Sequence, residues 1–288
     1  MELIRAIQGI FAPHFDQFML LVTHLGSPLA YIAFLVITYL SIDARAGRRI
    51  GFFFLLGFFL NQHLKELFDT NRPFILAPEV ARSEAAVSTA LGPGFPSGHA
   101  QGSTTFWGLG ALYAKRRLFT LVALIIISVV SFSRLYLGVH WPLDVFGGIL
   151  IGLAVVYVAA LTSRLMLTPP RWLVVGGGLL VPFGLHLALP TADSALILGG
   201  FAAVVSGPTL VRHRVGGALW SRVLLAVLGL SLVIGYLFAS SAFLSEAVKD
   251  HPVGGFVRYL VLGYLGIVVT PLLGRALKIA PGDEIENG

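Results

Sequence analysis

Cysteine is absent from the 288 residues, and charged side chains are scarce, at 12% of the chain. The missing thiols exclude disulfides, thiolate metal ligands and cysteine nucleophiles. A soluble globular protein carries about twice this charged fraction, whereas apolar residues here reach 56% and the mean hydropathy is +0.86. Long apolar runs recur between short polar gaps, which indicates a polytopic membrane protein. The runs are too long, and the gaps too short, for the alternating strands of a β-barrel.

Acidic residues are also few, with 14 Asp and Glu against 20 Lys and Arg, and the net charge is +6. Such an excess can indicate a nucleic-acid partner. Here the basic residues lie in short gaps between apolar runs, so we expect the bilayer, and not nucleic acid, as the partner. We expect no cleavable signal peptide, because Glu2 and Arg5 occupy the N-terminus and no small-residue cleavage pattern follows a short apolar region.

The apolar pattern predicts an all-α transmembrane bundle of about nine spans. Apolar residues within 1–26 recur near helical spacing, which favours an amphipathic segment at the membrane interface. Residues 27–165 would form the functional core, residues 166–280 would add further transmembrane helices, and the acidic tail at 281–288 would be disordered. The spans are expected at roughly 27–42, 49–68, 98–114, 118–138, 142–163, 171–189, 194–211, 218–240 and 255–275.

The distribution of Lys and Arg predicts the orientation of these spans. With nine spans, thirteen of the twenty basic residues fall on one side of the membrane. We therefore expect the N-terminus outside and the C-terminus in the cytoplasm. The loops at 69–97 and 139–141 would then share the outer side. The basic residues left on that side are Arg5, Lys65, Arg72, Arg82, Arg134, Lys249 and Arg258.

Two basic residues precede the first of these loops. Lys65 and Arg72 are seven positions apart, so on a continuous helix they would share a face. Pro73 would then end that helix. The alternative is that both side chains merely extend to the membrane surface from a helix end.

The stretch Phe95-Pro96-Ser97-Gly98-His99 lies between a polar loop and an apolar run. Pro96 suits the first turn of a helix, where its missing N–H would have no partner. Ser97 and Gly98 would present a hydroxyl and backbone N–H groups at the positive end of the helix dipole, an arrangement that suits a phosphate. His99 adds a titratable donor. The alternative is a simple helix cap.

A third polar group follows at the junction of two expected spans. Ser133-Arg134 closes one span, and His140 opens the next. Asp144 lies four residues after His140, so we expect these two side chains one above the other on a helix face. Asp144 could accept the Nδ1–H of His140 and leave Nε2 free as a nucleophile or base. A structural His–Asp pair is the alternative.

Taken together and in this order, the three segments resemble the signature of the type 2 phosphatidic acid phosphatase (PAP2) superfamily, over residues 60–150. The resemblance implies that His140 attacks phosphorus to form a phosphohistidine, Asp144 orients it, and His99 protonates the leaving oxygen. It also implies a lipid phosphate substrate and no cofactor. The implied phosphate-binding residues are Lys65, Arg72, Ser97, Gly98 and Arg134.

The charges agree with this resemblance. A phosphate monoester carries close to two negative charges near pH 7, and Lys65, Arg72 and Arg134 would supply three positive ones. The carboxylates are scattered, whereas Mg²⁺ would need a cluster of them, so we expect metal-independent chemistry and no metal site.

Many phosphatases of this family have six helices, with the first motif after a third span. Here the first motif follows the second strong span and further spans lie beyond the core, a layout more similar to the glucose-6-phosphatase and sphingosine-1-phosphate phosphatase branches. The motifs read only the phosphate, so the lipid and the oligomeric state stay open. We expect an integral protein of a bacterial or archaeal plasma membrane, with an extracytoplasmic active site. A lipid phosphotransferase using the same site and a non-enzymatic transporter or scaffold are the alternatives.

Overall fold

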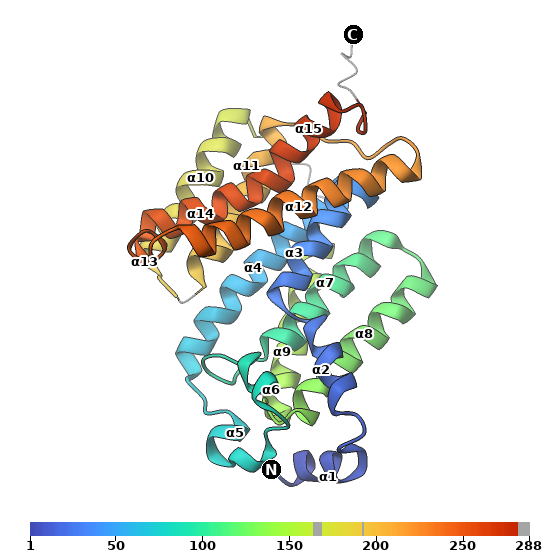
Figure 1. Ribbon diagram of the computed structural model, residues 1–288, viewed down its shortest axis with the longest axis vertical. Helices are drawn as coiled ribbons and strands as arrows, with labels where there is room; N and C mark the ends of the chain where they lie inside the picture. Colours follow the sequence, from blue (N-terminus) through green and yellow to red (C-terminus); the bar gives the residue numbers. More distant parts are fainter. Residues whose placement is uncertain (164–168, 192, 282–288) are drawn as a thin grey trace. The chain divides into compact units, whose positions relative to one another are not determined.

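The computed structural model describes residues 1–163, 169–191 and 193–281, and every regular element in these ranges is helical (Figure 1). The expected all-α class is therefore confirmed. Of the tail predicted to be disordered, residues 282–288 lie outside the described residues.

The elements up to residue 163 carry the three motifs and the loops between them. They are α1 (Glu2–Phe11), α2 (Asp16–His24), α3 (Pro28–Ile37), the π-helical segment η1 (Thr38–Ile42), α4 (Ala44–Phe68), α5 (Pro73–Leu76), the 3₁₀ turn η2 (Pro78–Val80), α6 (Glu84–Ser88), α7 (Gly98–Ala114), α8 (Arg117–Tyr136) and α9 (Pro142–Thr162). The later elements are α10 (Arg171–Ala188), α11 (Ser194–Leu210), α12 (Leu219–Phe243), α13 (Glu246–Asp250), α14 (Pro252–Tyr264), the π-helical segment η3 (Leu265–Val269) and α15 (Thr270–Ala276).

Within the described residues, five helices are long and apolar enough to cross a membrane: α8, α9, α10, α12 and the continuous helix Pro252–Ala276. The pair formed by α2 and Pro28–Ile42 adds a sixth if it counts as one broken span. Each of the nine predicted segments is helical, but the count of nine spans is not confirmed. α7 explains part of the difference, because polar residues fill its first half and are buried in the protein: Gln101, Ser103, Thr104 and Thr105.

The chain divides into two compact units. Unit 1 comprises Met1–Tyr31 and Gly57–Leu165, and unit 2 comprises Ile32–Leu56 and Met166–Gly288. All three motifs lie in unit 1. The four-part division expected from the sequence stays a prediction.

Helix α7 packs against both α8 and α9 in unit 1, in the green part of Figure 1. Two glycines of α9 allow this close approach. A Cβ at Gly148 would lie 2.5 Å from the carbonyl oxygen of Ser97, and one at Gly152 would lie 2.6 Å from the Cβ of Thr104. Small residues at helix contacts are typical of packing in membranes. Here they bring the start of α9 against the start of α7, where two of the motifs lie.

Helices α1 and α2 also pack against α8 in unit 1. Ile4 is fully buried and packs beside Ala77 and Val80 of the long loop. The Gln8 side chain donates from Nε2 to the carbonyls of Val80 and Tyr136, at 2.8 Å each. The segment predicted as amphipathic is thus helical and joined to the motif loops, while its place at a membrane interface stays a prediction.

In unit 2, α11 packs against α10 and α14, and α12 packs against η1 and η3. The buried side chain of His186 on α10 joins two other parts of this unit. Its Nδ1 lies 2.9 Å from the hydroxyl of Ser194, and its Nε2 lies 3.1 Å from the carbonyl of Pro252. Both ring nitrogens therefore have partners, as expected of a structural histidine.

Candidate active site

Lys65 and Arg72 meet at one carbonyl and not along one helix. α4 ends one residue before Asp69, whose φ is 40°, and Arg72 caps the short helix α5, whose first residue is Pro73. The prediction of a continuous helix ended by Pro73 is therefore wrong, because this proline begins a helix. The two side chains still converge, since Lys65 Nζ and Arg72 Nη2 donate to the carbonyl of Pro93 at 2.7 and 3.0 Å.

The Arg72 guanidinium also touches the candidate nucleophile. Its Nη1 lies 2.9 Å from His140 Nε2 and 3.0 Å from the carbonyl oxygen of Val139. Its Nε and Nη2 donate to the carbonyls of Gly92 and Leu91 at 2.8 and 2.9 Å. A guanidinium has donors only, so Nε2 of His140 is the acceptor in this contact.

Asp144 lies at the opposite edge of the His140 ring. Its Oδ2 is 3.2 Å from His140 Nδ1 and accepts the backbone N–H of Trp141 at 2.8 Å. Because Nε2 accepts from Arg72, the proton of the neutral ring lies on Nδ1, facing the carboxylate. His140 precedes α9, which begins at Pro142. The i,i+4 spacing predicted that the two side chains share a helix face. They lie instead on either side of the N-cap of α9.

The electrostatic surroundings keep His140 neutral. Burial lowers the pKa of His140 well below its ordinary value, and the positive charges of Arg72, Arg134 and Lys65 lower this pKa further. Burial also lowers the pKa of Arg72, to about 10, while Asp144 opposes that change. At pH 7 the site thus holds a protonated Arg72 beside an imidazole whose Nε2 keeps its lone pair.

Ser97 is the N-cap of α7 and is completely buried. Its hydroxyl lies 3.4 Å from the N–H of Ala100, the usual capping contact. The helix begins at Gly98, so Pro96 lies before the cap and not in the first turn, where it was predicted. The first N–H groups of α7 are still those that a phosphate at a helix N-terminus would bind.

The half-buried ring of His99 lies against the bend between α2 and α3. A Cβ at Gly26 would lie 2.8 Å from His99 Cδ2 and 2.9 Å from a methyl of Val130, so only glycine fits there. Within the part of the chain that the structure describes, Nε2 of His99 has no hydrogen-bond partner. A buried ring nitrogen in this state is available to a ligand.

Arg134 is fully buried, and its hydrogen bonds run to two threonines. Nη1 donates to the hydroxyls of Thr23 at 2.6 Å and Thr89 at 2.8 Å, and Nη2 donates to the carbonyl of Thr89 at 3.2 Å. Its Nε has no partner among the described residues. Neither threonine could be predicted from the sequence, because a single hydroxyl far along the chain belongs to no motif.

Three buried hydrogen bonds hold the second motif in place. The N–H of Ser97 donates to the backbone carbonyl of Asp144 at 2.9 Å and so joins the second and third motifs. Between α4 and α7, Asn61 Nδ2 donates to Gln101 Oε1 at 2.7 Å, and Gln101 Nε2 donates to the carbonyl of Gly57 at 2.7 Å. These bonds fix the start of α7 relative to the end of α4.

The long loop of the site is bound to the N-terminal helices by an ion pair. Arg82 donates from Nε and Nη2 to Oδ1 and Oδ2 of Asp16, at 3.0 and 2.7 Å. The hydroxyl of Tyr136 donates to the same carboxylate. A two-point contact of this kind fixes orientation as well as distance, so the loop and α2 hold a defined position beside the motifs.

All eight residues predicted from the sequence lie in unit 1, and contacts join five of them. The connected residues are Lys65, Arg72, Ser97, His140 and Asp144, and beside them lie the fully buried Arg134 and the buried Nε2 of His99. Gly98 contributes the first N–H of α7. Across the described residues, no group of three or more His, Asp or Glu side chains could hold a metal ion. The roles of these residues stay predictions.

Three comparisons with known proteins bear on this site. Residues 46–165 match the family model of the PAP2 superfamily. Mouse sphingosine-1-phosphate phosphatase 2 is 31% identical over 157 residues, covering 52% of this chain and 41% of that protein. Phosphatidylglycerophosphatase B of Escherichia coli (strain K12) is 40% identical over 100 residues, covering 32% of this chain and 38% of that protein.

A solved structure shares the helical arrangement. The crystal structure of Aquifex aeolicus LpxE superposes with a TM-score of 0.50 at 25% identity, covering 55% of this chain and 92% of that one. The chain thus spans less than half the length of the two curated relatives, and the likeness to LpxE covers about half of this chain.

Proposed function

Residues 46–165 belong to the PAP2 superfamily, and on this premise we propose that the chain is a membrane phosphatase for lipid phosphates. It would hydrolyse a phosphate monoester or a diphosphate through a phosphohistidine. One observation carries the proposal: the buried His140 ring lies between Arg72 at Nε2 and Asp144 at Nδ1, at 2.9 and 3.2 Å. This is the arrangement that leaves a neutral imidazole with its lone pair toward a cationic, phosphate-binding group.

The first step forms the covalent intermediate. Nε2 of His140 bonds to phosphorus while the bond from phosphorus to the lipid oxygen breaks. The leaving oxygen takes the electron pair of that bond and receives a proton from His99, which carries this proton once the negative charge of the bound phosphate offsets the cationic side chains around it. Asp144 accepts the Nδ1–H and stabilises the positive charge that develops on the ring. The Arg72 donor that faces Nε2 in the free site turns to a phosphate oxygen when the substrate enters.

The second step releases phosphate. A water oxygen attacks phosphorus, the bond from nitrogen to phosphorus breaks, and its electron pair returns to Nε2. His99, which gave up a proton in the first step, takes one from the attacking water. The atoms balance: ester and water become alcohol and inorganic phosphate, and both histidines regain their starting state.

The charge of the site suits this chemistry. A phosphate monoester carries close to two negative charges, which Lys65, Arg72 and Arg134 would offset. The N–H groups at the start of α7 add partial positive charge. Donors fixed before the substrate arrives stabilise a transition state without the cost of reorganisation.

The substrate is proposed to be a lipid because large apolar side chains beside the site are exposed. Leu143 and Phe146, which flank Asp144 on α9, are 68% and 58% exposed, and Leu91, whose carbonyl binds Arg72, is 81% exposed. An acyl or isoprenyl chain lying in the bilayer would cover these residues. Two of the matched relatives are named as phosphatases of lipid phosphates, sphingosine-1-phosphate and phosphatidylglycerophosphate.

The test is phosphate release by the purified protein from a panel of lipid and soluble phosphates. His140→Ala should reduce release by several orders of magnitude, as loss of a nucleophile does in other enzymes. His14→Ala, which changes an exposed histidine of the same unit, should leave it unchanged. In the wild type, a phosphoenzyme trapped from labelled substrate should be labile to acid and absent from His140→Ala. Activity of His140→Ala within about tenfold of wild type would remove this residue from the nucleophile role.

A further inference from the structure

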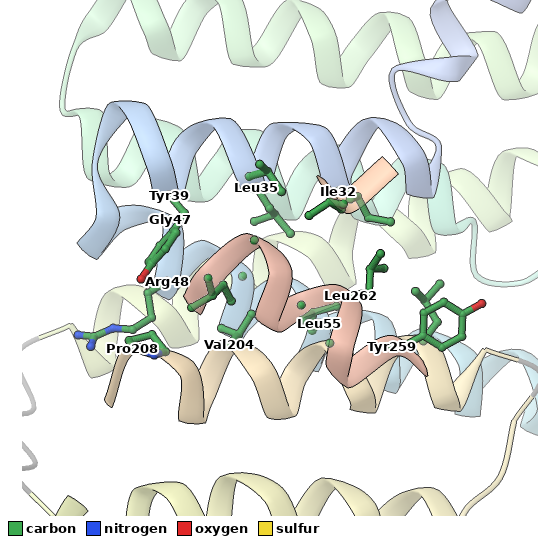
Figure 2. Close-up of a pocket in the computed structure, with 18 residues that line it drawn as sticks. Ile32, Leu35, Tyr39, Gly47, Arg48, Leu55, Val204, Pro208, Tyr259 and Leu262 are labelled. Atoms are coloured by element: carbon green, nitrogen blue, oxygen red, sulfur yellow. The ribbon is translucent and has the colours of Figure 1, made fainter. Parts of the chain in front are cut away.

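Unit 2 contains an apolar cavity of about 120 Å³ that takes no part in the chemistry proposed above (Figure 2). Its wall is built from α3, η1, the first part of α4, α11, α12, α14 and η3. Along α11 the wall runs from Leu196 to Pro208. These positions are twelve residues apart, about 18 Å at the rise of an α-helix. The cavity is therefore long and narrow.

The wall is made mostly of leucine, isoleucine, valine and glycine. Two of its glycines face space. A Cβ at Gly51 would have its nearest neighbour, Val204, at 3.4 Å, and a Cβ at Gly200 would have Leu55 at 3.7 Å. Both distances are ordinary contacts, so larger side chains at these positions would extend into the cavity without a clash at Cβ. An interior of this kind disfavours a polar ligand, because a buried polar group would find no partner.

Polar groups occur at the two ends of the cavity. Figure 2 shows Arg48 with Tyr39 and Pro208 at one end and Tyr259 at the other. Arg48 is exposed and lies near the start of α4, while Pro208 lies near the end of α11. This end of the cavity therefore coincides with the ends of two apolar helices. The guanidinium of Arg48 keeps its charge at any ordinary pH, so this end of the cavity is positively charged.

We propose that this cavity binds part of one acyl chain of an anionic phospholipid, whose phosphate lies against Arg48. An engineered cavity of about 150 Å³ holds a benzene molecule, so the cavity in unit 2 has room for about five carbons of a chain. The remainder of the lipid would lie along the helices in the bilayer. A long, narrow space favours a flexible chain over a rigid ring. A guanidinium at the membrane boundary favours an anionic head group.

The site gives unit 2 a role of its own. In the wall, the stretch Gly47–Leu55 falls within residues 46–165, and the other lining residues fall outside them. Lipid bound here would join α4 to α11 and α14 across a space that side chains leave open. It would therefore stabilise unit 2 without touching the phosphate site.

The experiment compares phosphatidylglycerol with phosphatidylcholine of the same chain length, added to the purified protein in neutral detergent. Both lipids are phosphate diesters, so neither is a substrate of the kind proposed for unit 1, and the two proposals can fail separately. Phosphatidylglycerol should raise the unfolding midpoint of the wild type by at least about 2 °C more than phosphatidylcholine does. Native mass spectrometry should show retained phosphatidylglycerol.

Two substitutions divide the site into its parts. Gly200→Leu fills the cavity and should remove the response to both lipids, whereas Arg48→Ala should remove only the preference for phosphatidylglycerol. Two controls match them. Gly184→Leu changes an exposed glycine of α10 with nothing within 4 Å of its Cβ position, and Arg45→Ala changes an exposed arginine that does not line the cavity. Both controls should respond as wild type.

Full lipid response in Gly200→Leu would overturn the proposal. Equal loss of preference in Arg45→Ala and Arg48→Ala would also overturn it, because surface charge alone would then explain the preference. If Gly200→Leu does not fold, Gly51→Val and cross-linking decide the question. A phosphatidylglycerol with a diazirine in its chain should cross-link to α11 and α14 in the wild type. Cross-links confined to α10 would contradict the site.

Discussion

The guanidinium of Arg134 donates to the hydroxyl of Thr23 across 2.6 Å, and both side chains are fully buried. Arg134 belongs to the third motif, whereas Thr23 lies on α2, before the segment matched by the PAP2 family. Thr89 of the long loop supplies a second hydroxyl to the same Nη1, at 2.8 Å. A helix outside the matched segment therefore takes part in positioning a residue inside it.

Thr23→Val should lower kcat/KM for the lipid phosphate by about tenfold or more, because a buried donor that loses its acceptor costs about 1–3 kcal/mol. The valine keeps the shape of the side chain, so packing changes little. Thr23→Ser keeps the hydroxyl and should restore most of the activity, which a purely structural role of the methyl group would not allow. Steady-state kinetics on the three proteins measure this.

Thr162→Val is the matched control, because that hydroxyl donates to the carbonyl of Val158 within α9, away from the motifs. Wild-type kcat/KM in Thr23→Val, or equal losses in Thr23→Val and Thr162→Val, would show that Thr23 does not position Arg134 for catalysis.

The proximity of His140 and Asp144 could be predicted from the sequence, because a spacing of four brings two side chains together whether the chain is helical or enters a helix through its cap. The convergence of Lys65 and Arg72 was also predicted, but through the wrong local structure. A proline after a basic residue is compatible with both the end and the start of a helix, so Pro73 alone could not decide between them.

The contacts of Arg134 could not be predicted. Thr23 is 111 residues away and Thr89 is 45 residues away, and a single hydroxyl leaves no periodic or compositional trace. The count of nine spans is not confirmed, for a related reason. An apolar run predicts a helix well, but the polar residues of α7 are buried against other helices, and only packing shows whether such a helix crosses a membrane.

Arg72→Lys should reduce kcat/KM by about 100-fold or more, a loss similar to that of one fixed donor in an oxyanion hole. All three nitrogens of the guanidinium donate in this structure, to loop carbonyls and toward Nε2 of His140. A lysine ammonium has no planar fork and cannot reproduce this set of directions.

Arg82→Lys is the control. Arg82 lies in the same long loop but pairs with Asp16 of α2, and it is not one of the proposed phosphate-binding residues. It should lose much less activity. The unfolding midpoint of each variant separates a loss of catalysis from a loss of folding. Equal kcat/KM for Arg72→Lys and wild type would mean that positive charge alone is sufficient.

Vanadate should inhibit phosphate release, and EDTA should leave it intact. A site that surrounds phosphorus with donors binds the five-coordinate vanadate more tightly than the substrate. The sequence offers no carboxylate cluster of the kind that Mg²⁺ prefers. Titrations of both reagents against initial rate provide the measurement. Loss of turnover on chelation, with recovery on adding Mg²⁺, would refute metal-independent hydrolysis.

The last prediction is that the phosphate site faces the extracytoplasmic side. Thirteen of the twenty Lys and Arg fall on the opposite side when the nine predicted segments all cross the membrane. Three of the seven on the side of the site are Lys65, Arg72 and Arg134, which the proposed chemistry requires. The remaining ratio of thirteen to four is a strong bias under the positive-inside rule.

Single cysteines can test this orientation cleanly, because the chain has no native cysteine. Ser88, in the long loop, and Ala114, the last residue of α7, are both exposed. α7 starts at Gly98 beside the motifs, so Ala114 lies about 24 Å along the helix from the site. In intact cells, Ser88→Cys should react with a membrane-impermeant maleimide, and Ala114→Cys should react only after the membrane is permeabilised. Labelling of Ala114→Cys but not Ser88→Cys would place the chemistry in the cytoplasm, and equal labelling of both would mean that α7 does not separate the two sides.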